Sequence, residues 1–403
     1  MRRTVLGVLR ESKTPPDKRV PITPAYCESL RLEYDTLDII VQPSDVRGYS
    51  DEEYRELGIT IQEDLSACDI IMGVKEVAIE DLLEGKKYFF FSHTIKKQEH
   101  NAKLLQAVLR KNIQLIDYEC LTYQNGLRII GFGRYAGIVG AYNGLLGYGR
   151  RKGLYDLKRA NGCKDLAELH AQLADMHLPP IKVVLTGEGR VAGGAKETLD
   201  ALKVECVSAK EFLHEEFDHA VYTQLGVLDY NARTDGKESS EEHFFKKASE
   251  YETAFIPYTK VSDIFISCHF WDPAAPKLFS AHDVQNPFFK IEVISDISCD
   301  IEGSIPTTLA ASTIADPFYG YNTESGGRGE AFDDGNITIT SIDNLPCELP
   351  RDSSEGFAED LSNHVLPYIM GKDPDDIIGR ASITKDGKLT KEYSYLSEYA
   401  SGA

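Results

Sequence analysis

The sequence predicts an α/β protein with two Rossmann-like, doubly wound parallel-sheet domains and an active-site cleft between them. Apolar runs of strand length alternate with helix-length segments from the start of the chain, and a glycine-rich turn follows one apolar strand in its middle. The 403 residues are enough for two or three domains of about 150 residues each. We expect residues 1–140 and 325–403 to form a discontinuous substrate-binding, catalytic domain, and residues 141–324 to form a dinucleotide-binding domain.

The first domain is expected to alternate strands with helices. Pro follows Thr23 at the first position of one helix, and Ser50 caps another helix that has an acidic first turn and stops at Gly58. A third helix is expected at 97–110. Strands are expected at 5–8, 37–41, 70–74, 88–92 and 113–118. Alternation of this kind is typical of a parallel sheet with helices on its faces.

A long helix that leaves the first domain is expected at 134–153, where glycines three or four residues apart allow close packing. Strands are expected at 181–185, 204–207, 264–267 and 291–294, with a glycine-rich turn at 187–194 and a helix at 195–202. In the segment expected to return to the first domain, residues 337–342 alternate like a strand and 355–370 favour one or more helices.

Composition excludes several classes of function. The 64 Asp and Glu residues outnumber the 44 Lys and Arg residues, so the net charge is −20 and no basic block is available for nucleic acid. Apolar runs stay far below the roughly 20 residues of a membrane helix, and Val5 begins a strand too early for a signal peptide. We therefore expect a cytoplasmic protein that acts on small molecules without nucleic acid, membrane or catalytic metal, its oligomeric state being left open.

The glycine-rich turn has the spacing of a dinucleotide-binding fingerprint. Residues 186–192 read TGEGRVA, which fits G-x-G-x-x-(G/A) between an apolar strand and a helix. Gly187 would make the tight turn, Gly189 would let the pyrophosphate approach, and Ala192 would let the helix pack closely. The helix amides, beginning at Arg190 and Val191, would bind the phosphates. The alternative is a plain glycine-rich turn, but the flanking strand and helix favour dinucleotide binding.

The next strand bears on the choice of cofactor. An acidic residue at its end normally binds the ribose hydroxyls of NAD. Here Ser208 and Lys210 follow the expected strand, so a 2′-phosphate could be held and the sequence favours NADP. NAD is the alternative, through Glu205 or Glu211, and Lys210 is equally explained as a solvated loop residue.

A second group of candidate residues lies in the first domain. Lys75 and His93 each follow an apolar strand, at the edge where ligands bind in open parallel sheets. An amine and an imidazole there could divide the acid and base roles, because His titrates near neutrality and nearby cations lower the pKa of Lys. Arg19 lies in the same part of the chain. Taken singly, a loop lysine is usually solvated and a lone histidine is usually structural.

Several separated segments share a family resemblance. They read RESK at 10–13, DKRVPITP at 17–24, FFSHTIKKQE at 90–99, LIDYE at 115–119, GFGRYAG at 131–137 and SIDNLP at 341–346. The opening resembles the superfamily of alanine dehydrogenase, transhydrogenase and saccharopine dehydrogenase. The later segments resemble the lysine-ketoglutarate reductase module of the bifunctional lysine-degrading enzyme, and no saccharopine-cleaving module is expected after them.

The resemblance implies roles for individual residues in the first domain. Lys75 and His93 match the acid–base pair of the related fungal saccharopine dehydrogenases. Lys96 and Glu119 match charged residues that tune this pair and lie near the substrate. Arg19 and Arg128 match arginines near the substrate carboxylates, although the residues that flank Arg128 differ from the family pattern.

The resemblance also implies cofactor contacts and a reaction. Asp300 matches an aspartate beside the nicotinamide ribose, and Asn344 lies in the segment that approaches the same ring in alanine dehydrogenases. The implied enzyme is an NAD(P)-dependent oxidoreductase that condenses L-lysine with 2-oxoglutarate and reduces the imine to saccharopine. The alternatives are the same reaction run towards lysine with NAD, an alanine dehydrogenase, and a dinucleotide-binding sensor without turnover.

Charge gives a further expectation about the site. The proposed substrates carry carboxylates, which the net charge of −20 would repel. We therefore expect Arg19, Lys75, His93, Lys96 and Arg128 to converge in a basic pocket inside an acidic protein.

Overall fold

The computed structural model describes residues 3–174 and 176–401, which fold as two compact units. The first unit lies within residues 1–132 and 350–403, and the second comprises residues 133–349. This division differs from the expected boundaries near 140 and 325. Residues 325–349 stay with the second unit because β16 (Asn336–Thr340) pairs in parallel with β13 (Val293–Asp296) of the second sheet.

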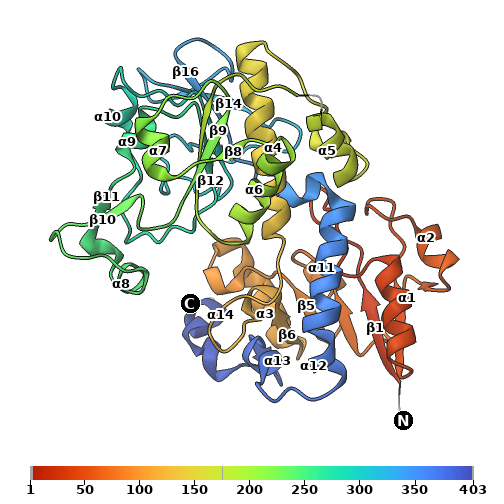
Figure 1. Cartoon of the computed structure of the whole chain (residues 1–403). Helices are drawn as coiled ribbons and strands as arrows, with labels where there is room; N and C mark the ends of the chain where they lie inside the picture. Colours follow the sequence, from red (N-terminus) through yellow and green to blue (C-terminus); the bar gives the residue numbers. More distant parts are fainter. Residues whose placement is uncertain (1–2, 175, 402–403) are drawn as a thin grey trace. The chain divides into compact units, whose positions relative to one another are not determined.

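The first unit is built on a parallel sheet, as predicted (Figure 1). In spatial order its strands are β3 (Thr60–Ile61), β2 (Leu37–Val41), β1 (Thr4–Val8), β4 (Ile70–Met72), β5 (Lys87–Phe90) and β6 (Gln114–Asp117). Its helices are α1 (Pro24–Glu33), α2 (Asp51–Glu56), α3 (Ala102–Arg110), α11 (Pro350–His364), α12 (Leu366–Met370), α13 (Ile377–Arg380) and α14 (Ser397–Ser401). A small hairpin of β17 (Thr384–Lys385) and β18 (Lys388–Leu389) precedes α14.

Alternate side chains of this sheet enter two cores. Phe89 of β5 packs in the core that α1 and α11 cover, where Leu361 also lies. Its neighbours Tyr88 and Phe90 enter the opposite core, which α3 covers with Leu105. Strands buried on both faces read as continuous apolar runs, which is why the sequence predicts them well. The expected helix at 97–110 starts only at Ala102, because residues 94–96 and 99–101 form short 3-10 turns.

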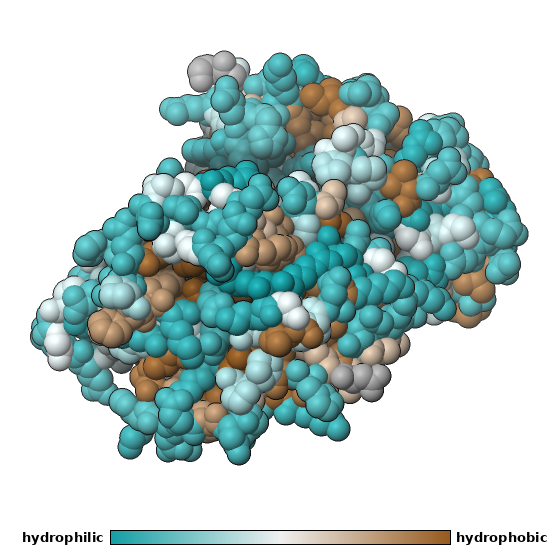
Figure 2. Space-filling model, turned by 90° about the horizontal axis from the view of Figure 1, so that it is seen from above, coloured by the Kyte–Doolittle hydropathy of each residue, from teal (hydrophilic) through white to brown (hydrophobic). Residues whose placement is uncertain are grey.

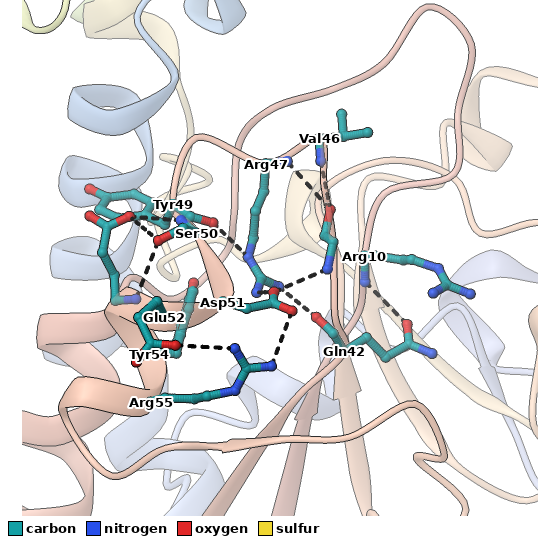
Figure 3. A network of polar contacts seen from close by, with 12 residues as sticks. Arg10, Gln42, Val46, Arg47, Tyr49, Ser50, Asp51, Glu52, Tyr54 and Arg55 are labelled. Carbon is teal, nitrogen blue, oxygen red and sulfur yellow. Dashed lines mark hydrogen bonds and ion pairs between the residues drawn. The ribbon is translucent and has the colours of Figure 1, made fainter.

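A polar network fixes the loop that joins β2 to α2 (Figure 3). The buried Arg47 guanidinium donates to the Gln42 carbonyl at 2.6 Å and to the Tyr49 carbonyl at 2.8 Å, and it pairs with Asp51. The Gln42 side chain accepts from the Arg10 backbone N–H at 3.1 Å. The network therefore ties this loop to the end of β1, where the candidate site begins.

The second unit is built on a mixed sheet. In spatial order its strands are β15 (Arg328–Gly329), β14 (Tyr319–Asn322), β16, β13, β12 (Ile264–Ser267), β7 (Lys182–Thr186), β9 (Val221–Leu225) and β8 (Glu205–Cys206). The run from β16 to β8 is parallel, whereas β14 pairs antiparallel with β15 and β16. A separate hairpin of β10 (Asn231–Arg233) and β11 (Tyr251–Thr253) carries α8 (Glu241–Lys246) away from this sheet (Figure 1).

Beside the glycine-rich loop, strand order in the second sheet departs from the sequence prediction. No strand is expected at 221–225, but β9 occupies the position next to β7 and displaces β8 to the edge. The physical reason is burial. The β9 sequence VYTQL is buried at four of its five positions, whereas both residues of β8 are exposed. An exposed, charged strand is suited to a sheet edge, and an apolar strand is suited to the interior.

Helices cover both faces of the second sheet. One face carries α4 (Gly133–Lys152) and α6 (Arg190–Ala201), which lie side by side (Figure 1). Besides α8, the other helices of the unit are α5 (Leu166–Ala174), α7 (Ala209–His214), α9 (Ile256–Thr259) and α10 (Ala281–Val284). The helix expected at 195–202 begins five residues earlier, because Gly189 is its N-cap.

Close packing of α4 on α6 requires glycine on both helices. A Cβ atom added to Gly137 would lie 1.8 Å from the Val191 carbonyl oxygen, and one added to Gly194 would lie 1.9 Å from the Arg134 carbonyl oxygen. The sequence assigns this role to Ala192, which is buried, but the two glycines make the closest approach.

Hydrophilic residues dominate the face shown in Figure 2, where hydrophobic residues form small separated patches. This distribution agrees with the net charge of −20. Within the described ranges, no helix has the length and apolar character needed to cross a bilayer.

Candidate active site

Lys75 lies just beyond the C-terminal end of β4, on a loop held by a buried carboxylate. Glu11 accepts the backbone N–H groups of Val74 and Lys75 at 2.6 and 2.9 Å. The half-buried Lys75 ammonium has no hydrogen-bond or ion-pair partner among the described residues. Burial, and then the charges of Arg19 and Lys13, lower its pKa. Lys75 therefore releases its proton more readily than an ordinary lysine does.

His93 follows β5, the strand adjacent to β4, and is directed by a neighbouring carboxylate. Its backbone is left-handed, with φ at 52°, a conformation that is uncommon outside glycine and often occurs at functional sites. Nδ1 lies 2.6 Å from a Glu76 carboxylate oxygen, and the other Glu76 oxygen accepts from Lys13 at 3.0 Å. Because Glu76 engages Nδ1, the His93 Nε2 atom is the one left for a reactant.

Glu76 is held ionised by this arrangement. Burial alone would raise its pKa, but the hydrogen bond and charge of His93, together with Lys13, outweigh burial and lower the pKa to about 2. Burial raises the pKa of the neighbouring Glu11 carboxyl to about 7. A cavity of about 220 Å³ is lined by Glu11, Lys75 and Glu76 together with neighbouring residues, so a small molecule has access to this loop.

Glu119 follows β6 and lies between two cations. It pairs with Arg128 and lies 3.5 Å from the Lys96 ammonium. Burial alone would raise the Glu119 pKa, but the charges of Arg128, Lys96 and His93 lower it. Both cations are at least half exposed, whereas Glu119 is 8% exposed, so Arg128 and Lys96 can also meet a ligand.

Buried Asp117 joins the loops that carry His93 and Glu119. One of its carboxylate oxygens accepts from the Ser92 backbone N–H and hydroxyl at 2.9 and 2.5 Å. The other accepts from the Glu119 N–H at 2.8 Å. The His93 and Glu119 loops are thereby held in one relative position.

Arg19 is buried rather than open to solvent. Its Nε and Nη2 atoms donate to the Asp17 carboxylate at 3.0 and 2.6 Å, and its guanidinium lies 4.2 Å from the centre of the Phe132 ring. The side chain is 3% exposed. Its charge still reaches Lys75, whose pKa it helps to lower.

The five basic residues that were expected to converge all belong to the first unit, and four of them pair with acidic side chains. Lys75, His93 and Glu119 follow the adjacent strands β4, β5 and β6, and Asp117 links the last two loops. Acidic side chains pair with most of the cations, so the site is a network of mixed charge. No role was predicted from the sequence for Glu11, Glu76 or Asp117. Glu11 and Asp117 lie within the segments RESK and LIDYE, and the position of Glu76 directly after Lys75 was an available signal.

The glycine-rich loop of the second unit fits a dinucleotide. Gly187 has φ at +96°, and a Cβ atom there would lie 2.8 Å from the Cys268 carbonyl oxygen, so only glycine suits the position. A Cβ atom at Gly189 would meet nothing within 4 Å, which leaves room for a pyrophosphate above the amides that begin α6 at Arg190 and Val191. The neighbouring His269 bridges the hydroxyls of Thr186 and Ser304 at 2.8 and 3.0 Å.

The other cofactor residues expected from the sequence lie on separate elements of the second unit. Ser208 is the N-cap of α7, where its hydroxyl donates to Glu211 at 2.6 Å, and Lys210 is exposed in the first turn of that helix. Asp300 lies in the turn after β13, and Asn344 precedes the 3-10 turn Leu345–Glu348. None of these four residues belongs to the loop 187–191.

Comparison with known proteins finds similarity to one family model, to several named enzymes and to solved structures. Residues 7–139 match the family model "Alanine dehydrogenase/PNT, N-terminal domain". The alpha-aminoadipic semialdehyde synthase of Arabidopsis thaliana is 30% identical over 97% of this chain, which spans only 41% of that protein. The saccharopine dehydrogenase [NAD(+), L-lysine-forming] of Neurospora crassa is 26% identical over 91% of both chains. Among solved structures, an L-alanine dehydrogenase superposes with a TM-score of 0.62 at 15% identity over 99% of both chains.

The fold and the glycine-rich loop define the class of two-unit α/β proteins with a Rossmann-like unit, and the likeness to alanine dehydrogenase supports this fold. Within that class, the chain resembles the saccharopine dehydrogenase and lysine-ketoglutarate reductase family of the alanine dehydrogenase and transhydrogenase superfamily. The family resemblance expected from the sequence segments is confirmed.

Replacing Glu76 by Gln is expected to lower stability in a pH-dependent way. The Glu76 pKa falls from an ordinary 4.5 to about 2 on folding, so the carboxylate stabilises the folded state above pH 4.5 and loses this effect as pH falls towards 2. The shift corresponds to on the order of 3 kcal/mol. Urea unfolding followed by circular dichroism should therefore show a large deficit at pH 7 that shrinks at pH 3.

Glu80→Gln is the matched control for this prediction, because Glu80 is an exposed acid on the same loop. Its effect should stay within about 0.5 kcal/mol at both pH values. An equal deficit of Glu76→Gln at pH 7 and pH 3 would contradict the assignment of a strongly held carboxylate.

Proposed function

We propose that this chain is an NAD(P)-dependent oxidoreductase that joins the ε-amine of L-lysine to 2-oxoglutarate and reduces the product to saccharopine. The observation that carries the proposal is that Lys75, whose pKa is lowered, and His93, which Glu76 directs, follow the adjacent strands β4 and β5. The family relatives named saccharopine dehydrogenase support the same reaction type. The dinucleotide would be held in the second unit by Gly187, Gly189 and the amides of Arg190 and Val191, with Asp300 and Asn344 on the nicotinamide side.

The reaction needs one group to accept a proton and another to donate one. The lysine ε-ammonium must lose a proton before it attacks the ketone carbon, and Lys75 is suited to accept that proton because its own pKa is lowered. Attack forms a carbinolamine, whose hydroxyl must leave as water to give the imine. His93 Nε2 is suited to donate a proton to that hydroxyl, since Glu76 engages Nδ1 and leaves Nε2 to face a reactant. When bound, the reduced nicotinamide supplies the hydride that converts the imine to the secondary amine.

Charged residues around the pair would place the substrate carboxylates. Arg128 and Lys96 are exposed enough to bind them, and an arginine can do so through two parallel hydrogen bonds. Glu119 lies between these two cations and limits the effect of their positive charges on Lys75 and His93. Arg19 would act on carboxylates only if it shared its guanidinium with Asp17, since both side chains are buried.

An assay of paired substrates tests this proposal. Lysine with 2-oxoglutarate, ornithine with 2-oxoglutarate, and ammonia with pyruvate are each offered with NADH and with NADPH, and oxidation of the cofactor is followed by its absorbance. We expect oxidation with lysine and 2-oxoglutarate. Oxidation with ammonia and pyruvate alone would assign an alanine dehydrogenase, and no oxidation by any pair, ornithine with 2-oxoglutarate included, would favour a dinucleotide sensor.

A further inference from the structure

The strand that borders the glycine-rich loop is β9, not the strand that follows α6 in the sequence. Thr186 at the end of β7 is in register with Leu225 at the end of β9. The Gly187 N–H donates to the Leu225 carbonyl at 2.8 Å, and the Gln224 amide donates to the Gly187 carbonyl at 2.9 Å. β8, which ends near Ser208, lies one strand further away, beyond β9.

This order changes which residues can reach the cofactor ribose. In dinucleotide-binding folds, the residue at the end of the strand beside the glycine loop contacts the ribose that distinguishes NAD from NADP. An acid there accepts hydrogen bonds from the 2′-hydroxyl, whereas a basic residue accommodates the 2′-phosphate of NADP. The relevant residues in this chain are therefore those after Leu225.

Two carboxylates lie at the end of β9. Asp229 closes a turn on Gly226, whose N–H donates to the Asp229 carboxylate at 2.7 Å. Glu188, the second residue of the glycine-rich loop, reaches the same place. A Cβ atom added to Gly226 would lie 2.7 Å from a Glu188 carboxylate oxygen and 3.5 Å from an Asp229 one. After burial, the charges of Glu188 and Asp229 also raise the pKa of Tyr230, which confirms that both face one locality.

Ser208 and Lys210, which the sequence predicts could hold a 2′-phosphate, are poorly placed to do so. The Ser208 hydroxyl forms a capping box with Glu211, donating to its carboxylate at 2.6 Å and accepting its N–H at 3.2 Å. Lys210 belongs to the helix that follows the edge strand. A 2′-phosphate beside β9 would instead meet the carboxylates of Glu188 and Asp229. Like charges at such short range oppose binding, whereas ribose hydroxyls can donate to the same oxygens.

We propose that Asp229 and Glu188 make this chain select NAD(H) over NADP(H). The inference rests on the proposed dinucleotide site of the second unit, and it reverses the preference for NADP that the sequence favours. It assigns the selection to the end of β9, a strand that the sequence pattern does not reveal, and it assigns no part to Ser208 or Lys210.

Direct binding to the full chain tests this inference without using turnover. Isothermal titration calorimetry with NADH and NADPH should give at least about tenfold tighter binding of NADH. The double variant Asp229→Asn with Glu188→Gln should lower that ratio by about fivefold or more, mainly by improving NADPH binding. Both carboxylates are exposed, so the wild-type ratio should also fall as salt is raised from 0.05 to about 0.5 M.

Controls separate this inference from the proposed reaction. Glu238→Gln removes one exposed negative charge of the hairpin region after β10 and should leave the NADH to NADPH ratio unchanged. Equal or tighter binding of NADPH by the wild-type chain, or an unchanged ratio in the folded double variant, would overturn the inference. Binding of neither dinucleotide would overturn both proposals. Preferential NADH binding without turnover of any substrate pair would overturn only the reaction.

Discussion

Replacing Lys75 by Met is expected to lower the turnover number for saccharopine formation by a factor of about 100 or more. Proton transfer by a positioned side chain contributes roughly 100-fold to 10,000-fold to such reactions, and Met fills similar space without a titratable group. Lys75→Arg should be similarly impaired, because arginine keeps the charge but does not release its proton at neutral pH. The measurement is the initial rate at saturating lysine, 2-oxoglutarate and reduced cofactor.

Lys87→Met is the matched control for the Lys75 variants. Lys87 is exposed and lies at the opposite end of β5 from His93, so its loss should leave the turnover number unchanged. Thermal unfolding of all three variants shows whether the fold is retained. A Lys75→Met turnover number within about threefold of the wild-type value would remove Lys75 from the proton-transfer step.

The location of the candidate pair could be predicted from the sequence because it depends on local features. Lys75 and His93 follow apolar strands, and parallel strands end at one edge, so spacing along the chain was sufficient. The electrostatic character of the site could not be predicted in the same way. It depends on Glu11, which follows β1, accepting the backbone N–H groups of Val74 and Lys75, and on Glu76 pairing with His93 after β5. Residue types alone do not specify these contacts.

Strand order explains the largest departure from the sequence prediction. An apolar strand followed by a glycine-rich turn and a helix normally leads to a neighbouring strand, and β8 follows α6 at the expected distance. β9 enters between β7 and β8 because its side chains are buried there, which is a property of the assembled sheet. In the proposed dinucleotide site, the position expected to contact the ribose therefore moves from the region of Ser208 to Asp229, about twice as far along the chain from the loop.

Gly194→Ala and Gly193→Ala are expected to change stability in opposite directions, although the residues are neighbours in α6. The added Cβ atom at Gly194 would lie 1.9 Å from the Arg134 carbonyl oxygen of α4, so the two helices would have to separate. Backbone cannot yield as a flexible side chain does, and we expect a loss of at least about 3 kcal/mol, at the upper end of overpacking effects. The displaced start of α6 should also weaken dinucleotide binding.

At Gly193 the added Cβ atom meets nothing within 4 Å, and the residue is exposed in the same helix. Alanine there removes the backbone entropy cost of glycine and should raise the free energy of unfolding by about 0.5 to 1 kcal/mol. Urea unfolding of both variants measures the difference under identical conditions. Both changes replace glycine by alanine within one helix, so helix propensity affects them alike. A difference of about 4 kcal/mol between their free energies of unfolding would therefore measure the close contact between α4 and α6. Equal stabilities would instead show that α4 and α6 do not pack through Gly194.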